Sequence, residues 1–239
     1  MLGTLTTSFP ALGAPWFIRW LYSSSRLALR LYFRQVRIDG QQHLPRTGPV
    51  ILAPTHRSRW DALVVPYAVG RPVTGRDLRF MVSDDEMRGL QGWVIRHAGG
   101  FSVNTLQPAI AALRYGIEVL KAGESLVIFP EGNIFRDRQV QALKPGLARL
   151  ALQAATARPD LKIVPIHLSY QPLIPDWGAQ VEVKIGQPLN VNHYTLERPK
   201  QAAQTLTVDL KLALEQLAGS SPPAQQRLKE QVITQSVFR

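Results

Sequence analysis

The chain has 239 residues, of which 45% are hydrophobic and 19% charged, so it suits one α/β domain with a sizeable core and excludes a disordered chain. The absence of cysteine excludes disulfides, a catalytic thiolate and cysteine metal ligands. The formal net charge of +11 favours an anionic partner, which can be nucleic acid, an anionic membrane surface or a phosphorylated substrate.

Residues 1–34 carry an amphipathic pattern. Aromatic and aliphatic side chains are interleaved here with arginines, and Arg26, Arg30 and Arg34 are spaced so that they share one helical face. This pattern is typical of a helix in a membrane interface, and the alternative is a helix packed on the protein's own core with a solvated basic edge. No apolar run reaches the roughly 18 residues of a spanning helix, and we expect no cleaved signal peptide, because a basic n-region is missing.

Residues 35–218 alternate between strand and helix patterns. Short apolar or alternating runs predict strands at residues 35–40, 49–54, 79–82, 101–103, 125–129, 162–168 and 181–185. Apolar residues at helical spacing predict helices at about residues 59–69, 83–97, 108–121, 147–156 and 197–217. We therefore expect a single α/β domain, with a mixed, mostly parallel sheet covered by helices. Residues 219–239 follow as a polar tail.

Three local signals refine these elements. Ser83 as an N-cap, with Glu86 three residues later, predicts one helix from Ser83 to residue 97. Pro66 is expected to end or kink the helix in which it lies. Pro165 cannot donate to a strand ladder, so its strand is predicted to lie at a sheet edge or to carry a bulge.

A histidine and an aspartate follow the buried strand at residues 49–54, in the segment Thr55-His56-Arg57-Ser58-Arg59-Trp60-Asp61. Residues five apart on a straight helix point about 140° apart, so the two side chains meet only if His56 lies in a turn and Asp61 in the first helical turn. A carboxylate so placed orients an imidazole as a general base. The alternative is a capping box, with Ser58 at the N-cap and Asp61 at N3.

A second polar segment, Pro130-Glu131-Gly132-Asn133, leaves the end of the predicted strand at residues 125–129. Ligands of α/β folds gather at strand ends, and three basic residues follow within reach of this turn: Arg136, Arg138 and Lys144. Such a loop can hold an anionic head group by charge-assisted hydrogen bonds. The alternative is an ordinary turn with solvated charges.

Together these segments resemble the glycerolipid acyltransferase family, whose best-known members acylate lysophosphatidic acid. The resemblance rests on four blocks in the family's order: His56-Arg57-Ser58-Arg59-Trp60-Asp61, Gly99-Gly100-Phe101-Ser102-Val103-Asn104, Phe129-Pro130-Glu131-Gly132 with Lys144-Pro145-Gly146, and Ile163-Val164-Pro165-Ile166. It spans about residues 36–189 and implies an acyltransferase domain at residues 35–218. The His-x4-Asp block combined with Phe-Pro-Glu-Gly about 70 residues later is more specific than either block alone.

The resemblance implies an O-acyltransferase in which His56 is the general base and Asp61 its orienting partner. The acceptor hydroxyl, deprotonated by His56, attacks the carbonyl of an acyl thioester, so acyl-CoA or acyl-carrier protein is the expected co-substrate. Glu131 and Gly132 are implied to lie beside the acceptor. No metal and no other cofactor is expected. We expect a membrane-associated protein on the cytoplasmic face, which meets a lipid acceptor and an anionic membrane surface and no nucleic acid.

Two positions depart from the family's pattern. The family's second block usually ends near an arginine, where this chain has Asn104, and its third block usually continues as Gly-Thr-Arg-Ser, where this chain has Gly132-Asn133-Ile134-Phe135-Arg136. In the family both arginines are associated with the acceptor's phosphate, which Asn and Ile cannot bind bidentately. We expect Asn104, Arg136 and Lys144 near the acceptor, most simply 1-acyl-glycerol-3-phosphate or a related lysolipid. The alternatives are a lipid alcohol without a phosphate as acceptor, and a non-catalytic lipid-binding protein.

Overall fold

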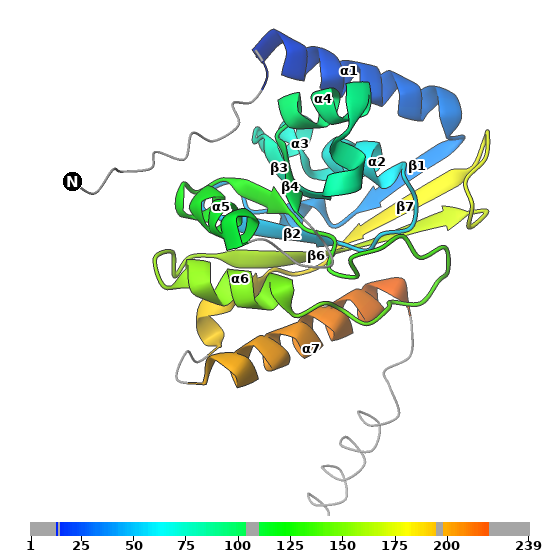
Figure 1. The fold of residues 1–239 in the computed structure, drawn as a ribbon. Helices are drawn as coiled ribbons and strands as arrows, with labels where there is room; N and C mark the ends of the chain where they lie inside the picture. The colour runs from blue at the N-terminus through cyan, green and yellow to red at the C-terminus, as the bar shows by residue number, and fades with distance from the viewer. Residues whose placement is uncertain (1–12, 14, 104–109, 195–197, 220–239) are drawn as a thin grey trace, which may run out of the picture.

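One sheet forms the centre of the computed structural model, which describes residues 13, 15–103, 110–194 and 198–219 (Figure 1). The strand order is β1-β7-β6-β2-β5-β3-β4, and β8 also pairs with β6. The strands are β1 (Gln35–Asp39), β2 (Val50–Pro54), β3 (Leu78–Ser83), β4 (Gly100–Val103), β5 (Ser125–Val127), β6 (Lys162–Gln171), β7 (Gln180–Ile185) and β8 (Leu189–Asn190). Only the pairs that β6 forms with β7 and β8 are antiparallel among the described strands. This mixed, mostly parallel sheet confirms the predicted α/β fold.

Helices cover both faces of this sheet (Figure 1). They are α1 (Pro15–Tyr32), α2 (Asp61–Val69), α3 (Arg71–Thr74), α4 (Gly89–His97), α5 (Ile110–Lys121), α6 (Gly146–Ala155) and α7 (Pro199–Ala218), with short 3₁₀ helices η1 (Gln41–His43), η2 (Asp84–Met87) and η3 (Val191–His193). The side chains of α5, α6 and α7 pack with Ile51 of β2, whereas those of α1 and α2 pack with its neighbour Leu52. Burial on both faces explains why β2 has a continuous apolar sequence.

Helix α1 has an inner and an outer face. Ile18 and Leu29 are buried, and the helix packs against α2. Four large apolar side chains are exposed on its outer side: Trp16, Trp20, Leu27 and Leu31. The inner face therefore matches the interpretation of a helix packed on the core, while the outer face keeps the pattern of an interfacial helix. Among the described residues, no helix has the length and apolar character needed to cross a membrane.

The prediction of one helix from Ser83 to residue 97 is wrong. The segment forms η2 and then α4, and Arg88 between them is extended, with φ −99° and ψ 152°. Gly89 follows with φ +58°, a left-handed conformation that glycine adopts without strain. The N-cap signal at Ser83 therefore marks only a single 3₁₀ turn before the chain changes direction.

Of the two alternatives predicted for the strand of Pro165, a sheet edge or a bulge, the sheet edge is wrong. Strand β6 lies inside the sheet, with β2 on one side and β7 and β8 on the other. The pairing with β8 ends at Ile163 and the pairing with β7 begins at Ile166, so Pro165 falls between the two partners. Its carbonyl still accepts a bond from the N–H of Gly186 at 2.9 Å. A proline is tolerated there because neither ladder requires its missing N–H.

Pro66 does not end its helix. Helix α2 continues through it to Val69, and the carbonyl of Pro66 accepts a hydrogen bond from the N–H of Gly70. The C-terminal helix begins at Pro199, two residues after the predicted start, and proline is favoured in the first turn because its missing N–H is not needed there.

The loops that follow β2 and β5 lie at the same edge of the sheet. The two strands are parallel neighbours, with Val50 paired to Ser125 and Leu52 to Val127. Ligand sites of α/β folds form where the carboxyl ends of parallel strands meet. The fold therefore brings the loop that carries His56 next to the loop that carries Glu131.

Candidate active site

His56 and Asp61 meet as the sequence predicts. His56 lies in the loop after β2, Asp61 is the first residue of α2, and the imidazole Nδ1 lies 2.8 Å from the carboxylate Oδ2. The Asp61 side chain is fully buried, whereas the His56 side chain keeps 21% of its surface exposed. With Nδ1–H bonded to the carboxylate, Nε2 is left as the basic nitrogen for a substrate. This is the arrangement of an oriented general base.

The Asp61 carboxylate accepts further hydrogen bonds from the loop that precedes α2. Its Oδ2 accepts the N–H of Arg57 at 2.7 Å and of Ser58 at 3.0 Å, and Ser58 Oγ accepts the N–H of Trp60 at 3.2 Å. The bond from the Ser58 N–H is one of the two expected of the capping box, but Ser58 Oγ accepts from Trp60 and not from Asp61, and the helix itself begins only at Asp61. The two interpretations of Asp61 are therefore not exclusive, because one carboxylate both shapes the loop and orients His56.

A tyrosine from a distant strand completes the environment of Asp61. The hydroxyl of Tyr170, on β6, donates to Asp61 Oδ1 at 2.6 Å. Burial raises the pKa of Tyr170 well above its ordinary value, and the neighbouring negative charge of Asp61 raises it further. The phenol therefore stays protonated and donates to the carboxylate across the whole physiological pH range. Nothing in the sequence near the His-x4-Asp block indicates this contact, which spans 109 positions.

The hydroxyl of Tyr170 is expected to hold Asp61, and through it His56. In Tyr170→Phe the ring stays in place but Asp61 loses one donor, which costs about 1.5–3 kcal/mol when the acceptor is charged. We expect the free energy of unfolding to fall by that order and kcat to fall about tenfold, with little change in KM for the acyl donor. Chemical denaturation measures the free energy of unfolding, and steady-state kinetics measure kcat and KM.

The matched control is Tyr194→Phe. Tyr194 also donates to a carboxylate, Asp209 Oδ2 at 2.8 Å, where the η3 turn meets α7. This variant should lose stability without losing kcat. Equal losses of kcat in the two variants would show that Tyr170 has only a structural role.

Glu131 joins the two loops of the site. Its Oε2 accepts the backbone N–H of His56 and Arg57 Nη1, both at 2.8 Å, and its Oε1 accepts Arg57 Nη2 at 3.0 Å and the N–H of Gln141 at 2.9 Å. Glu131 and Arg57 are both buried, so this bidentate ion pair is shielded from water. In the structure Glu131 lies beside His56 and positions the His56 backbone, whereas its place beside the acceptor stays a prediction.

Arg57 was missed by the sequence reasoning. Its guanidinium is buried, pairs with Glu131 and donates through Nη2 to the carbonyl of Gln139 at 3.0 Å. An arginine next to a buried strand, with a glutamate after the neighbouring parallel strand, is the signal that could have indicated this pair. A buried arginine needs such a partner, because an unpaired buried charge is costly.

Gly132 and Lys144 lie against each other beside Glu131. Gly132 has φ +72°, and a Cβ built there would come within 2.5 Å of Lys144 Cε and 2.7 Å of Lys144 Nζ. The backbone N–H of Lys144 also donates to the carbonyl of Pro130 at 2.8 Å. The structure thus brings Lys144 to the turn after β5, where the positive φ of residue 132 favours glycine.

The aromatic ring of Phe129 stacks on His56, with ring centroids 4.1 Å apart and planes inclined by 25°. The N–H of Phe135 donates to the carbonyl of His56 at 2.9 Å, so the chain before the exposed Arg136 runs along the His56 loop. Asn104, the remaining candidate, lies outside the described residues. The structure therefore brings together His56, Asp61, Glu131, Gly132 and Lys144 from the loops after β2 and β5.

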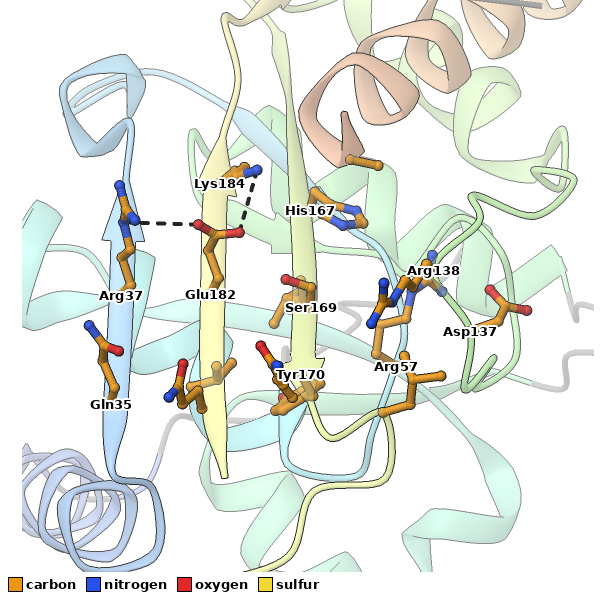
Figure 2. A pocket seen from close by; sticks show the side chains of 16 residues that line it. Gln35, Arg37, Arg57, Asp137, Arg138, His167, Ser169, Tyr170, Glu182 and Lys184 are labelled. Atoms are coloured by element: carbon orange, nitrogen blue, oxygen red, sulfur yellow. Dashed lines mark ion pairs between the residues drawn. The ribbon is translucent and has the colours of Figure 1, made fainter. Parts of the chain in front are cut away.

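Arg138 lines a polar groove of about 380 Å³, which it shares with Arg57 of the His56 loop and with Tyr170, whereas His56 and Asp61 do not line it (Figure 2). The groove follows the polar side of β1, β7 and β6, where Glu182 lies 3.9 Å from Arg37 and 3.4 Å from Lys184. His167 also lines it, and burial, followed by the nearby positive charges, lowers its pKa to about 4. Of the three basic residues singled out in the sequence, Arg138 is thus the one that lines this groove.

Comparisons with known proteins agree with this geometry. A family model described as Acyltransferase matches residues 35–169. The 1-acyl-sn-glycerol-3-phosphate acyltransferase of Streptococcus pneumoniae (strain ATCC BAA-255 / R6) is 27% identical over 168 residues, which are 65% of this chain and 58% of that protein. The chain thus spans less than two thirds of this curated relative.

A solved structure has a similar fold. The crystal structure of the 1-acyl-sn-glycerophosphate (LPA) acyltransferase PlsC from Thermotoga maritima superposes with a TM-score of 0.65 at 21% sequence identity, and covers 84% of this chain and 79% of that one. The resemblance of the four sequence blocks is confirmed by the family match, which includes the His56 and Glu131 loops and more than half of the chain. The chain belongs to the acyltransferase family.

Proposed function

We propose that the protein transfers a fatty acyl group from an acyl thioester to the hydroxyl of a lysolipid, most simply 1-acyl-glycerol-3-phosphate. The observation that carries the proposal is the oriented pair of His56 and the buried Asp61, whose exposed imidazole can receive a proton at Nε2. Membership of the acyltransferase family supports the same reaction class. The donor we propose is acyl-CoA or acyl-carrier protein.

The reaction needs no covalent acyl-enzyme. His56 Nε2 takes the proton of the acceptor hydroxyl while the hydroxyl oxygen attacks the thioester carbonyl, and the C–O bond forms. The tetrahedral intermediate then collapses, the C–S bond breaks, and the imidazolium returns its proton to the leaving thiolate. The charge of Asp61, held by four donors, stabilises the imidazolium between these two steps.

Lys144 is the residue that we propose to bind the acceptor's phosphate. Its side chain lies over Gly132, next to Glu131, which in turn holds the backbone N–H of His56. Arg136 follows Phe135 along the same loop and is exposed. These two cations can replace the family's arginines at the positions of Asn104 and Ile134. A phosphate accepts charge-assisted hydrogen bonds from the ammonium group of a lysine as well as from the guanidinium group of an arginine.

Removal of the Lys144 charge tests this assignment. Lys144→Met keeps the length of the side chain, and we expect KM for 1-acyl-glycerol-3-phosphate to rise about tenfold, which corresponds to about 1.4 kcal/mol. KM for a monoacylglycerol, which lacks the phosphate, should be unchanged. The exposed Lys200 on α7 provides the control variant Lys200→Met. If KM rises equally for both acceptors, Lys144 does not recognise the phosphate.

The outer face of α1 supports a position at a membrane surface. Trp16, Trp20, Leu27 and Leu31 are exposed on it, and arginines lie between them in the sequence. A helix of this kind lies in the headgroup region with its apolar side chains inserted. We propose that α1 holds the enzyme at the bilayer from which it draws its acceptor.

A direct assay tests the proposed reaction. Thiol release is measured from acyl-CoA, and separately from acyl-carrier protein, with a panel of lysolipids and lipid alcohols. Release that depends on an acceptor supports the transferase and identifies its acceptor class. Preference for an acceptor without a phosphate would favour the alternative that the changed positions Asn104 and Ile134 suggest. Absence of release from folded, vesicle-bound protein would favour a non-catalytic lipid-binding protein.

A further inference from the structure

The hairpin tip between β6 and β7, residues 172–179, carries three exposed apolar side chains. Leu173, Ile174 and Trp177 have 38%, 62% and 75% of their surface exposed. An apolar cluster of this kind at a loop tip marks an interaction site, because its burial is favourable in proportion to the area removed from water. We propose that this tip is a second membrane contact, which inserts these side chains into the headgroup region beside α1.

The hairpin tip is fixed to the end of α1. The hydroxyl of Tyr32 donates to the carbonyl of Pro175 at 3.1 Å, and the N–H of Gly178 donates to the carbonyl of Tyr32 at 2.8 Å. The rings of Tyr32 and Trp177 lie 5.7 Å apart, and the N–H of Arg34 donates to the carbonyl of Ala179 at 3.0 Å. The tip and α1 therefore form one surface, which would meet a flat bilayer together.

The opposite end of α1 bears a similar apolar element. The ring of Phe17 lies 5.6 Å from that of Trp93 on α4, and Trp93 and Leu90 are exposed. Helix α1 has 18 residues and is thus about 27 Å long, so α4, α1 and the hairpin tip follow one another along one side of the molecule (Figure 1). Four of the chain's five tryptophans are exposed along this strip, at positions 16, 20, 93 and 177. Tryptophan is the residue most typical of a membrane–water interface.

The charges along the strip favour an anionic lipid surface as the partner. Helix α1 contains no acidic residue, and Arg19, Arg26 and Arg30 are exposed on it. The hairpin tip has one carboxylate, Asp176. Exposed tryptophans between arginines bind by apolar insertion and by attraction to anionic headgroups at the same time. A bilayer also explains why the apolar side chains are spread along an extended strip and not gathered in one pocket.

The hairpin tip is close to the candidate active site along the chain. Tyr170, which donates to Asp61, lies three residues before Leu173, which is at most about 10 Å along the chain. Trp60, the neighbour of Asp61, packs on Tyr32 with ring centroids 4.2 Å apart. Insertion of the tip would therefore bring the His56–Asp61 pair to the level at which a lysolipid presents its hydroxyl. The choice of a lipid bilayer as the partner of the hairpin tip is the one part of this inference that rests on the proposed function.

Sedimentation with vesicles of phosphatidylcholine and phosphatidylglycerol tests the hairpin tip. The double variant Ile174→Ser with Trp177→Ser should bind these vesicles about tenfold more weakly or worse, a loss of about 1.4 kcal/mol or more. The control is Val208→Ser, since Val208 is half exposed on α7, which covers the other face of the sheet (Figure 1). This control should sediment like the wild type.

Vesicle binding does not depend on turnover, so His56→Ala, which tests the proposed reaction, should also sediment like the wild type. The double variant should keep its activity on a short-chain acceptor below its micelle concentration and lose activity on an acceptor embedded in vesicles. Unchanged sedimentation of the double variant would overturn the proposal. Loss of a dimer on size exclusion with unchanged vesicle binding would assign the tip to a second copy of the chain and would overturn it as well.

Discussion

His56→Ala is expected to lower acceptor-dependent thiol release by about 10²- to 10⁴-fold, the range contributed by a positioned general base. The imidazole is the only group of the site for which we propose a proton transfer, and its Nδ1 is already held by Asp61. Because we propose no other base for the acceptor hydroxyl, the residual rate should not depend on pH in the range in which an imidazole titrates. Steady-state assays with saturating donor and acceptor measure this loss.

The His56→Ala variant should still fold. Alanine keeps the backbone N–H that donates to Glu131 and the carbonyl that accepts from Phe135, so the two loops stay joined. What is lost is the stacking on Phe129 and the hydrogen bond to the buried Asp61, and the unfolding midpoint reports their combined cost. His193→Ala, at an exposed histidine of η3, is the control and should have wild-type activity. Near-normal turnover in His56→Ala would remove the general-base role.

Asp61→Asn is expected to reduce both the rate and the stability. The amide has the size of the carboxylate but lacks its charge, so the imidazolium loses its partner and kcat should fall by about 10²- to 10⁴-fold. Donors converge on both carboxylate oxygens, and the amide NH₂ must face one of them, which should cost about 1–3 kcal/mol of the free energy of unfolding. Turnover and chemical denaturation are measured on the same preparation.

Ser58→Ala separates the two roles of Asp61. It removes only the hydroxyl that accepts from the N–H of Trp60, and it leaves the contact between Asp61 and His56 intact. Loss of such a cap costs about 1 kcal/mol of stability, and we expect kcat to stay within about twofold of the wild type. If Asp61→Asn behaves in the same way, with lowered stability and a nearly unchanged rate, the carboxylate is a cap and not a catalytic partner.

The sequence allowed the local parts of this site to be predicted. The continuous apolar run of β2 indicated a strand buried on both faces, and the five-residue spacing required the bend in which His56 and Asp61 now meet. The alternation of strands and helices also indicated a mostly parallel sheet with ligand sites at its strand ends, whereas the neighbouring positions of β2 and β5, which place Glu131 beside His56, are known only from the structure. Each of these inferences depends on residues that are close in the sequence or on the general geometry of parallel sheets.

The parts that could not be predicted depend on contacts between distant residues. Tyr170 reaches Asp61 only because β6 extends past the end of β2, and no local pattern gives the lengths of neighbouring strands. Pro165 can lie inside the sheet because β8 pairs with the residues of β6 before it and β7 pairs with the residues of β6 after it. Likewise, the exposed Trp177 indicates an interaction surface only together with α1, because the hairpin packs against the end of that helix.

The measurement that tests the central claim most directly combines thiol release and ester formation in one assay. Acyl thioester and 1-acyl-glycerol-3-phosphate in mixed vesicles are incubated with the protein, and free thiol and diacylated product are counted together. We expect one ester for each thiol, no release without the acceptor, and no acyl group left on the protein. Thiol release without an acceptor, or neither product from folded and vesicle-bound protein, would contradict the proposed reaction.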